Sequence, residues 1–453
     1  MKNHRYCLEF FAFYDHTAIQ RRVEEMAAQG WLLEKPGNFL WIYRRTEPRR
    51  LHAAVTYFPT ASPFDPSPSQ GELTMEEFCA QDGWRLLARW GQMQIFVSQE
   101  EDPVPIDTDP MTQVETVHRS MKRAMLPGHL VLAAVILWQL WFQLLQFRQG
   151  PVGFLASTSS LLGVPMWLLL LLATLYEIFF YFWWHRKAVR GAADGFFLPV
   201  RTNRLASALL LGGAIFLLLF SAIGSRSRLG ILLGGCALYG VTILLTGRVR
   251  EMMKRRGAPK MATMVVTIGL AAIFASLSVW GMVAATIRGN LWREHPPAET
   301  YEFSGHTFSV YHDPLPLTVA DLTAPGDVRY STQAEREETF LLAQTRYSQD
   351  ALLGEARGAP ELTYTIIEVK APFLYPLCLA SVTKEDPLFE TQYRPAEAGP
   401  WGAASAAYQM YRHGEPTSWY LLLWEDRLAE VRLEDLPLTP QRMAVIGEKL
   451  RTA

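Results

Sequence analysis

The sequence predicts a multi-pass membrane protein of mixed α+β class. We expect a cytoplasmic domain of two βαββ repeats, an antiparallel sheet with two helices, then five transmembrane helices and an extracytoplasmic α+β domain. Two observations lead to this fold class: apolar residues are concentrated in the middle of the chain, and the phrase EEMAAQGW (Glu24–Trp31) returns as EEFCAQDGW (Glu76–Trp84). The expected parts are the repeat domain at 1–100, a linker with a basic juxtamembrane helix at 101–127, the membrane region at 128–287 and the last domain at 288–453.

Each repeat is predicted to contain a strand, an amphipathic helix and a hairpin. Gly30 and Gly83 supply the left-handed residue that ends each helix, and the aromatic anchors Trp31 and Trp84 follow them. Neither unit alone can cover the apolar stripe of its helix, so we expect the two units to share one antiparallel sheet with both helices on a single face. The duplicated phrase is therefore interpreted as core packing, with no chemistry attached.

The repeat domain resembles a known family. The segments EMAAQGWLLEK, FLWIYRR and FCAQDGWRLLARWGQMQIFVS, placed before membrane spans, are similar to domain-of-unknown-function family 2812, over about residues 5–100. That family occurs in Firmicutes, often encoded beside PadR-like transcriptional regulators. The resemblance implies a bacterial membrane protein under envelope-stress or ligand-responsive control, and it carries over no catalytic residue.

Five apolar runs are long enough to cross a bilayer core, which needs about 20 residues in a helix. They lie at 128–147, 161–184, 205–223, 229–247 and 262–287. Lys and Arg gather before the first run, after the second and after the fourth, which places these loops and the N-terminus in the cytoplasm and the C-terminus outside the cell membrane. The basic loops and the helix that begins at Asp109–Pro110 would attract anionic lipid, although a solvated linker helix is the equal alternative.

Two kinds of residue stand out within the runs. Glu177 is an acidic residue well inside a span, and such a carboxylate is either a proton or cation ligand or a packed structural group. Small residues at a four-residue spacing, Ala208 with Gly212 and Gly230 with Gly234, would let spans three and four approach closely. Intramolecular packing is the favoured interpretation of these pairs, and a homo-oligomer face is the alternative.

The last domain is predicted to contain hairpins, strands and a closing helix, with a second helix over GPWGAASAAYQMYR. Its weak candidates for chemistry are His312, Asp313 and Asp321, of which the first two could ligate a metal. A proline turn with Asp313 bonding the backbone is the favoured interpretation. No metal site and no cofactor is predicted.

We expect a non-enzymatic sensing, regulatory or scaffold protein, with another membrane or regulatory protein as a partner. A small transporter or permease component that uses Glu177, and a metal-dependent hydrolase on the outer face, are the alternatives. The net charge of −1 argues against a nucleic-acid binder, and four scattered cysteines argue against a disulfide framework.

Overall fold

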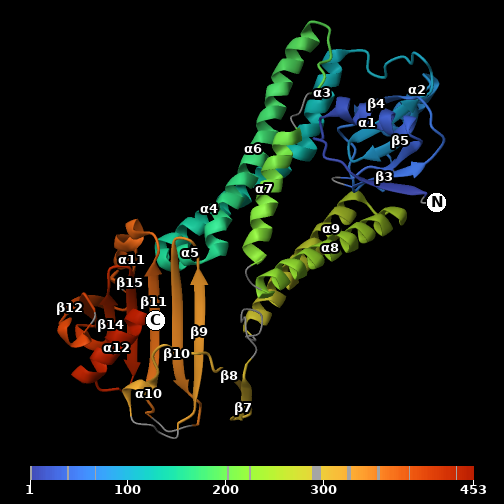
Figure 1. The fold of residues 1–453 in the computed structure, drawn as a ribbon. Helices are drawn as coiled ribbons and strands as arrows, with labels where there is room; N and C mark the ends of the chain where they lie inside the picture. The colour runs from blue at the N-terminus through green and yellow to red at the C-terminus, as the bar shows by residue number, and fades with distance from the viewer. Residues whose placement is uncertain are drawn as a thin grey trace. The chain divides into compact units, whose positions relative to one another are not determined.

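The computed structural model describes residues 3–37, 40–66, 68–200, 204–223, 226–287, 297–323, 328–354, 358–386, 388–402, 404–434 and 436–453 (Figure 1). The chain divides into two compact units, Met1–Gln139 with Met166–Trp292 and Leu140–Pro165 with Arg293–Ala453. The predicted start of the last domain, at 288–296, lies outside the described residues.

The first unit begins with the two βαββ repeats in the expected order. The first repeat is β1 (His4–Leu8), α1 (His16–Ala28), β2 (Trp31–Lys35) and β3 (Leu40–Arg45). The second repeat is β4 (His52–Tyr57), α2 (Gln70–Gln81), β5 (Arg85–Trp90) and β6 (Met93–Ser98). Gly30 and Gly83, with φ of +84° and +78°, follow the two helices.

The single sheet expected for the repeats is wrong. In the described part of the chain, each repeat has its own three-stranded antiparallel sheet, ordered β1-β3-β2 and β4-β6-β5. The register shifts in both outer strands that face the other repeat, between Leu33 and Lys35 in β2 and between Leu86 and Ala88 in β5. Such bulges bend and twist a strand, which accounts for two edges that approach each other without forming a ladder.

The two helices also do not share one face of a sheet. In the second sheet, Val55 lies opposite Ile95, and both belong to the core that α1 covers. The next pair along the strands, Ala54 and Phe96, packs on the other side, with Cys79 of α2. Because successive strand residues point to opposite faces and both sets here are apolar, the second sheet lies between the two helices.

Five helices of the described residues are long and apolar enough to cross a membrane. The helices of this region are α3 (Pro110–Ser120), α4 (Leu126–Gln149), α5 (Pro151–Ala156), α6 (Thr158–Ala193), α7 (Arg204–Ile223), α8 (Arg226–Arg255) and α9 (Lys260–Ile287). The Asp109 carboxylate caps α3 by accepting hydrogen bonds from the backbone N–H groups of Met111 and Thr112. A π-helical turn over Met121–Met125 joins α3 to α4, so the basic helix continues into the first span.

The second unit is built on an antiparallel sheet of seven strands among its described residues, ordered β12-β13-β14-β15-β11-β10-β9. Its strands are β9 (Tyr330–Glu338), β10 (Leu342–Ala351), β11 (Glu361–Val369), β12 (Thr391–Ala396), β13 (Ala406–Arg412), β14 (Glu415–Leu423) and β15 (Arg427–Glu434). The hairpin β7 (Glu299–Phe303) and β8 (His306–Val310) precedes them. The remaining helices are α10 (Val319–Leu322), α11 (Tyr375–Val382) and α12 (Pro440–Thr452).

Each face of this sheet has its own apolar core. Ile366 packs with α10 and α12 on one face, and Ile367 packs with α5 and α11 on the other. The helix expected over residues 399–412 is wrong: after a short 3-10 turn at Gly399–Trp401 the chain forms β13, and Ala407 pairs with Leu422. The alanines that favour a helix locally are small residues inside the sheet, where tertiary pairing overrides propensity.

Candidate ligand cleft and its junction with helix α6

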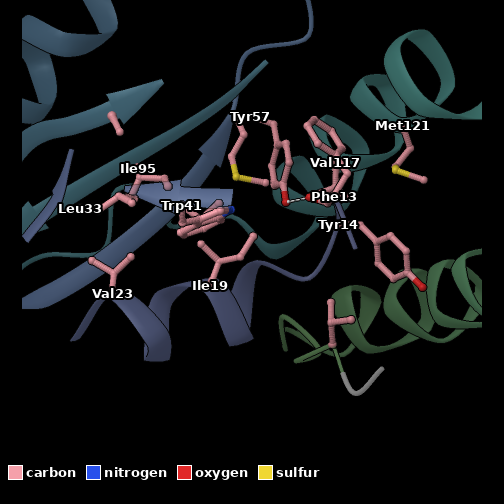
Figure 2. Packing of buried hydrophobic residues seen from close by; sticks show 14 of the residues in the cluster. Phe13, Tyr14, Ile19, Val23, Leu33, Trp41, Tyr57, Ile95, Val117 and Met121 are labelled. Atoms are coloured by element: carbon pink, nitrogen blue, oxygen red, sulfur yellow. Dashed lines mark hydrogen bonds between the residues drawn. The ribbon is translucent and has the colours of Figure 1, made fainter. Parts of the chain in front are cut away.

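The core of the repeat domain extends into the membrane helices. Val117 and Met121 from α3 and its π-helical turn belong to this core, as do Tyr181 and Trp184 of α6. Figure 2 shows Val117 beside Phe13 and Tyr57, with Met121 beyond them. The C-terminal end of α6 is therefore a structural part of the repeat domain.

The segment before α1 makes the aromatic contacts with α6. The Tyr57 hydroxyl donates a 2.6 Å hydrogen bond to the Phe13 carbonyl, which fixes this segment against β4 (Figure 2). The next residue, Tyr14, is buried and its ring lies 5.2 Å from that of Tyr181 and 5.6 Å from that of Trp184. These distances fit the preferred separation of aromatic pairs, so the start of α1 and the end of α6 form one packed layer.

Helices α3 and α6 meet through three polar rings. His118 Nδ1 and the Tyr181 hydroxyl share a hydrogen bond of 2.6 Å. The imidazoles of His118 and His185 stack with centroids 4.1 Å apart. His185 Nδ1 is buried and has no hydrogen-bond partner among the described residues. A buried polar atom without a partner is unfavourable unless something else satisfies it.

Beside this junction lies a cleft of about 480 Å³, which we name the junction cleft. It is lined by His16, Thr17, Gln20, Glu24, residues 52–57, Trp84, Asp102, Pro103, Pro105, Ile106, Asp107, Gln113, Thr116, Val117, Phe197 and Pro199. Elements α1, β4 and α3, the connector before α3 and the chain that follows α6 thus all contribute. A volume of several hundred Å³ with mixed apolar and polar walls is typical of a small-molecule site.

His16 is a buried polar residue of the cleft wall. Its Nδ1–H donates a 3.1 Å hydrogen bond to the Tyr14 carbonyl, and its ring packs against that of Phe197, with centroids 4.6 Å apart and planes tilted by 31°. Burial lowers the pKa of His16 to about 4, so the imidazole is neutral at pH 7. Its Nε2 is then an acceptor, and it has no partner in the described part of the chain.

Three carboxylate residues, Glu24, Asp102 and Asp107, complete the polar wall. Glu24 accepts a 2.9 Å hydrogen bond from the backbone N–H of Ala53 and so closes the free edge of β4. Burial raises the pKa of Asp107, the last connector residue in the cleft wall. A second cleft, of about 590 Å³, lies where β2 and β5 approach each other, lined by Leu32, Leu86 and Val97 among others.

Glu177 lies on α6, where the Ser207 hydroxyl of α7 donates a 3.1 Å hydrogen bond to its carboxylate. The small residues of spans three and four are not brought against another helix. Ala208 is exposed, and a Cβ added at Gly212, Gly230 or Gly234 would meet nothing within 4 Å among the described residues.

The candidates of the last domain have separate partners. His312 is exposed and its Nε2 lies 3.7 Å from Glu299. The Asp313 carboxylate accepts a 2.9 Å hydrogen bond from the backbone N–H of Ala334. Asp321 caps α10 and pairs with Lys449 at 2.7 Å, which lowers the pKa of its carboxyl group. No cluster of three or more metal-ligating side chains is found in the described ranges.

Sequence reasoning missed the residues that form the junction. Tyr181 and His185 lie four residues apart and so share one face of a helix. The spacing lies within the aromatic run YFWWH, Tyr181–His185, and is a signal that sequence reasoning did not use. His16 and Asp107 have no sequence signal, since only the fold brings them to one cleft. The contact of His118 with Tyr181 and His185 likewise depends on the fold. The two tryptophans that follow the helix-ending glycines differ in burial. Trp84 is buried and its indole N–H donates a 2.7 Å hydrogen bond to the Val104 carbonyl, whereas Trp31 is half-buried.

Residues 16–128 match a family described as "Protein of unknown function (DUF2812)", and the resemblance inferred from the sequence is confirmed. The match runs from the start of α1 to the first turn of α4, and so covers most of the wall of the junction cleft. A search of the curated proteins and of the solved structures finds no match to the chain.

Proposed function

From the DUF2812 domain at residues 16–128, we propose that this multi-pass membrane protein is a non-enzymatic sensor that links a cytoplasmic and an extracytoplasmic domain. A small molecule binds in the junction cleft, and its binding changes how the repeat domain holds α6. We infer the ligand class from the walls, which combine apolar groups with the carboxylates of Glu24, Asp102 and Asp107: a small molecule that donates hydrogen bonds.

The observation that carries this proposal is the continuity of α6. Near its start, Leu161 packs against the core that contains Val152 and Leu155 of α5. Near its end, Tyr181 and Trp184 belong to the core of the repeat domain. The helix rises about 30 Å between Leu161 and Tyr181 at roughly 1.5 Å per residue, which matches the hydrocarbon thickness of a bilayer.

In the proposed arrangement the basic loops face the cytoplasm and bind anionic lipid, and the repeat domain reads an internal signal. A change in the cleft alters the packing of Phe197 on His16, since both residues line it. Tyr14, two residues before His16, would pass this change to Tyr181 of α6. A ligand can shift the equilibrium only by its difference in affinity for the two arrangements. The open faces around Gly212, Gly230 and Gly234 are then available to a second copy or another membrane protein.

The test fills the cleft with an indole. Gln20→Trp places the ring in the cleft, and Arg21→Trp, on an exposed neighbouring position of the same helix, is the matched control. We expect hydrogen exchange of the α6 backbone at residues 181–192, measured in proteoliposomes, to change several-fold in Gln20→Trp and to stay at the wild-type rate in Arg21→Trp. Equal exchange in both variants would show that the cleft and α6 are not coupled.

A further inference from the structure

Helix α11 of the second unit presents an apolar outer face. The turn Pro372–Leu374 leads into this helix, and Cys378 on its inner side is fully buried against the sheet. The positions that are exposed over this turn and the helix are Pro372, Phe373, Pro376, Leu377 and Ala380. None of them is polar, and the Phe373 side chain is 76% exposed. An ordinary surface helix carries polar residues on the face that points away from its domain.

A second exposed ring lies next to this helix. Phe340, in the turn between β9 and β10, is also 76% exposed. Its neighbour Leu341 accepts a 3.0 Å hydrogen bond from the backbone N–H of Ala371, which directly precedes the turn into α11. We name the surface formed by Phe340, Pro372, Phe373, Pro376 and Leu377 the apolar ridge.

The apolar ridge lies at the end of the sheet that contacts α5, the short helix between the end of α4 and the start of α6. The Thr339 hydroxyl donates a 2.7 Å hydrogen bond to the carbonyl of Leu155 in α5, and the Thr158 hydroxyl at the start of α6 donates to the carbonyl of Glu338. Helix α5 connects the end of α4 to the start of α6, and it shares a core with Cys378. Figure 1 shows α5 and α11 at the same end of the seven-stranded sheet.

The position of the apolar ridge beside α5 indicates which partner covers it. The segment that links the membrane-length helices α4 and α6 is bound to Thr339 and Glu338. If both helices cross the membrane, the bilayer surface lies at this level. The last turns of α4 lead to the same end and carry the exposed apolar side chains Trp141 and Leu144. Aromatic side chains are enriched where membrane and water meet, and an apolar helical face inserts into the boundary between headgroups and acyl chains.

We propose that the apolar ridge is a membrane-docking surface, whose partner is the lipid of the leaflet at the α5 end. Phe340 and Phe373 enter the acyl boundary, and α11 lies along the surface. The C-terminal domain is thus held at the bilayer by the apolar ridge as well as by its packing against α5. This inference concerns the other unit and does not depend on the use of the junction cleft.

The test uses a photocrosslinking residue in the full-length protein. Phe373→p-benzoylphenylalanine and Phe340→p-benzoylphenylalanine are compared with the same residue at Leu353, which is 51% exposed and apolar. Leu353 follows the opposite end of β10, about 30 Å from the ridge at roughly 3.3 Å per strand residue. The variants are reconstituted in phosphatidylglycerol–phosphatidylethanolamine vesicles, irradiated and examined by mass spectrometry for phospholipid adducts.

We expect at least tenfold more phospholipid adduct at positions 373 and 340 than at 353. An adduct yield at the ridge no higher than at position 353 would overturn the proposal. Predominant crosslinking of position 373 to a second protein chain would overturn it as well, because the ridge would then be a protein interface. Identical proteolytic fragments from all three variants before irradiation establish that the fold is retained.

Discussion

The imidazole rings of His118 and His185 stack with centroids 4.1 Å apart and planes 7° from parallel. One ring belongs to α3, which follows the repeat domain, and the other belongs to α6, a helix long and apolar enough to cross a membrane. The contact therefore joins the region that matches DUF2812 to a helix of membrane-spanning length through two imidazole rings.

The hydroxyl of Tyr181 holds this contact together. Tyr181→Phe removes only the hydrogen bond to His118 Nδ1, and the loss of such a bond costs about 1 kcal/mol. We expect the backbone amides of α3 to exchange hydrogen roughly fivefold faster as the junction opens more often. Tyr176→Phe is the matched control, because the Tyr176 hydroxyl on the same helix has no hydrogen-bond partner among the described residues. A change of the same size in both variants would contradict the role given to the bond.

Acid should loosen the repeat domain through His16. The pKa of His16 is about 4 in the fold against 6.5 for the unfolded group. The unfolded chain takes up a proton between these values and the folded chain does not, so stability is complete above pH 6.5 and falls as the pH drops toward 4. From pH 7 to pH 5 the loss is about 2 kcal/mol. This loss of unfolding free energy is measured on the detergent-solubilised protein by denaturant unfolding at each pH, with hydrogen exchange in β4 and α1 as the readout.

The control for this prediction is His16→Gln, which keeps a donor for the Tyr14 carbonyl but does not titrate in this range. The variant should lose most of the extra acid sensitivity. If wild type and variant lose the same free energy between pH 7 and pH 5, another group is responsible and the neutral, buried His16 is ruled out as the cause.

In the second unit, the backbone of α12 at Gly447 lies against the carbonyl of Trp401, and adding one methyl group at Gly447 tests this contact. A Cβ at Gly447 of α12 would overlap the carbonyl of Trp401, so Gly447→Ala forces a backbone shift. Overpacking of this kind costs about 1–3 kcal/mol, against the gain that alanine normally brings inside a helix. Thermal unfolding should show a lower midpoint for Gly447→Ala, while Glu448→Ala, at an exposed neighbouring position, should unfold as the wild type does. A Gly447→Ala variant as stable as Glu448→Ala would mean that α12 does not lie against Trp401.

Local patterns predicted the elements far better than their arrangement. The repeat order, the five apolar helices and the closing helix α12 follow from periodicity and from helix start and stop signals. Separate sheets could not be predicted, because the bulges at Leu33 and Leu86 depend on the partner strand. The strand at Ala406–Arg412 has an alanine-rich start that favours a helix until its neighbours in the sheet are known.

The site was less accessible to sequence than the fold. The cleft wall takes His16 from the first helix, Asp107 from a linker and Phe197 from the chain after the second span. No local pattern links residues so far apart. Conversely, Glu177 stood out because a carboxylate is conspicuous among apolar residues, and the structure pairs it with Ser207.

The central claim is that the repeat domain and the C-terminal domain face opposite sides of the membrane. Cysteines introduced at exposed Phe78 of α2 and exposed Leu353 test it, in a background where Cys7 and Cys236 are serine and the buried Cys79 and Cys378 are kept. With a membrane-impermeant maleimide applied to intact cells, we predict labelling of Leu353→Cys at once and of Phe78→Cys only after permeabilisation. Labelling of both variants under the same condition would place the two domains on one side and contradict signalling across the membrane.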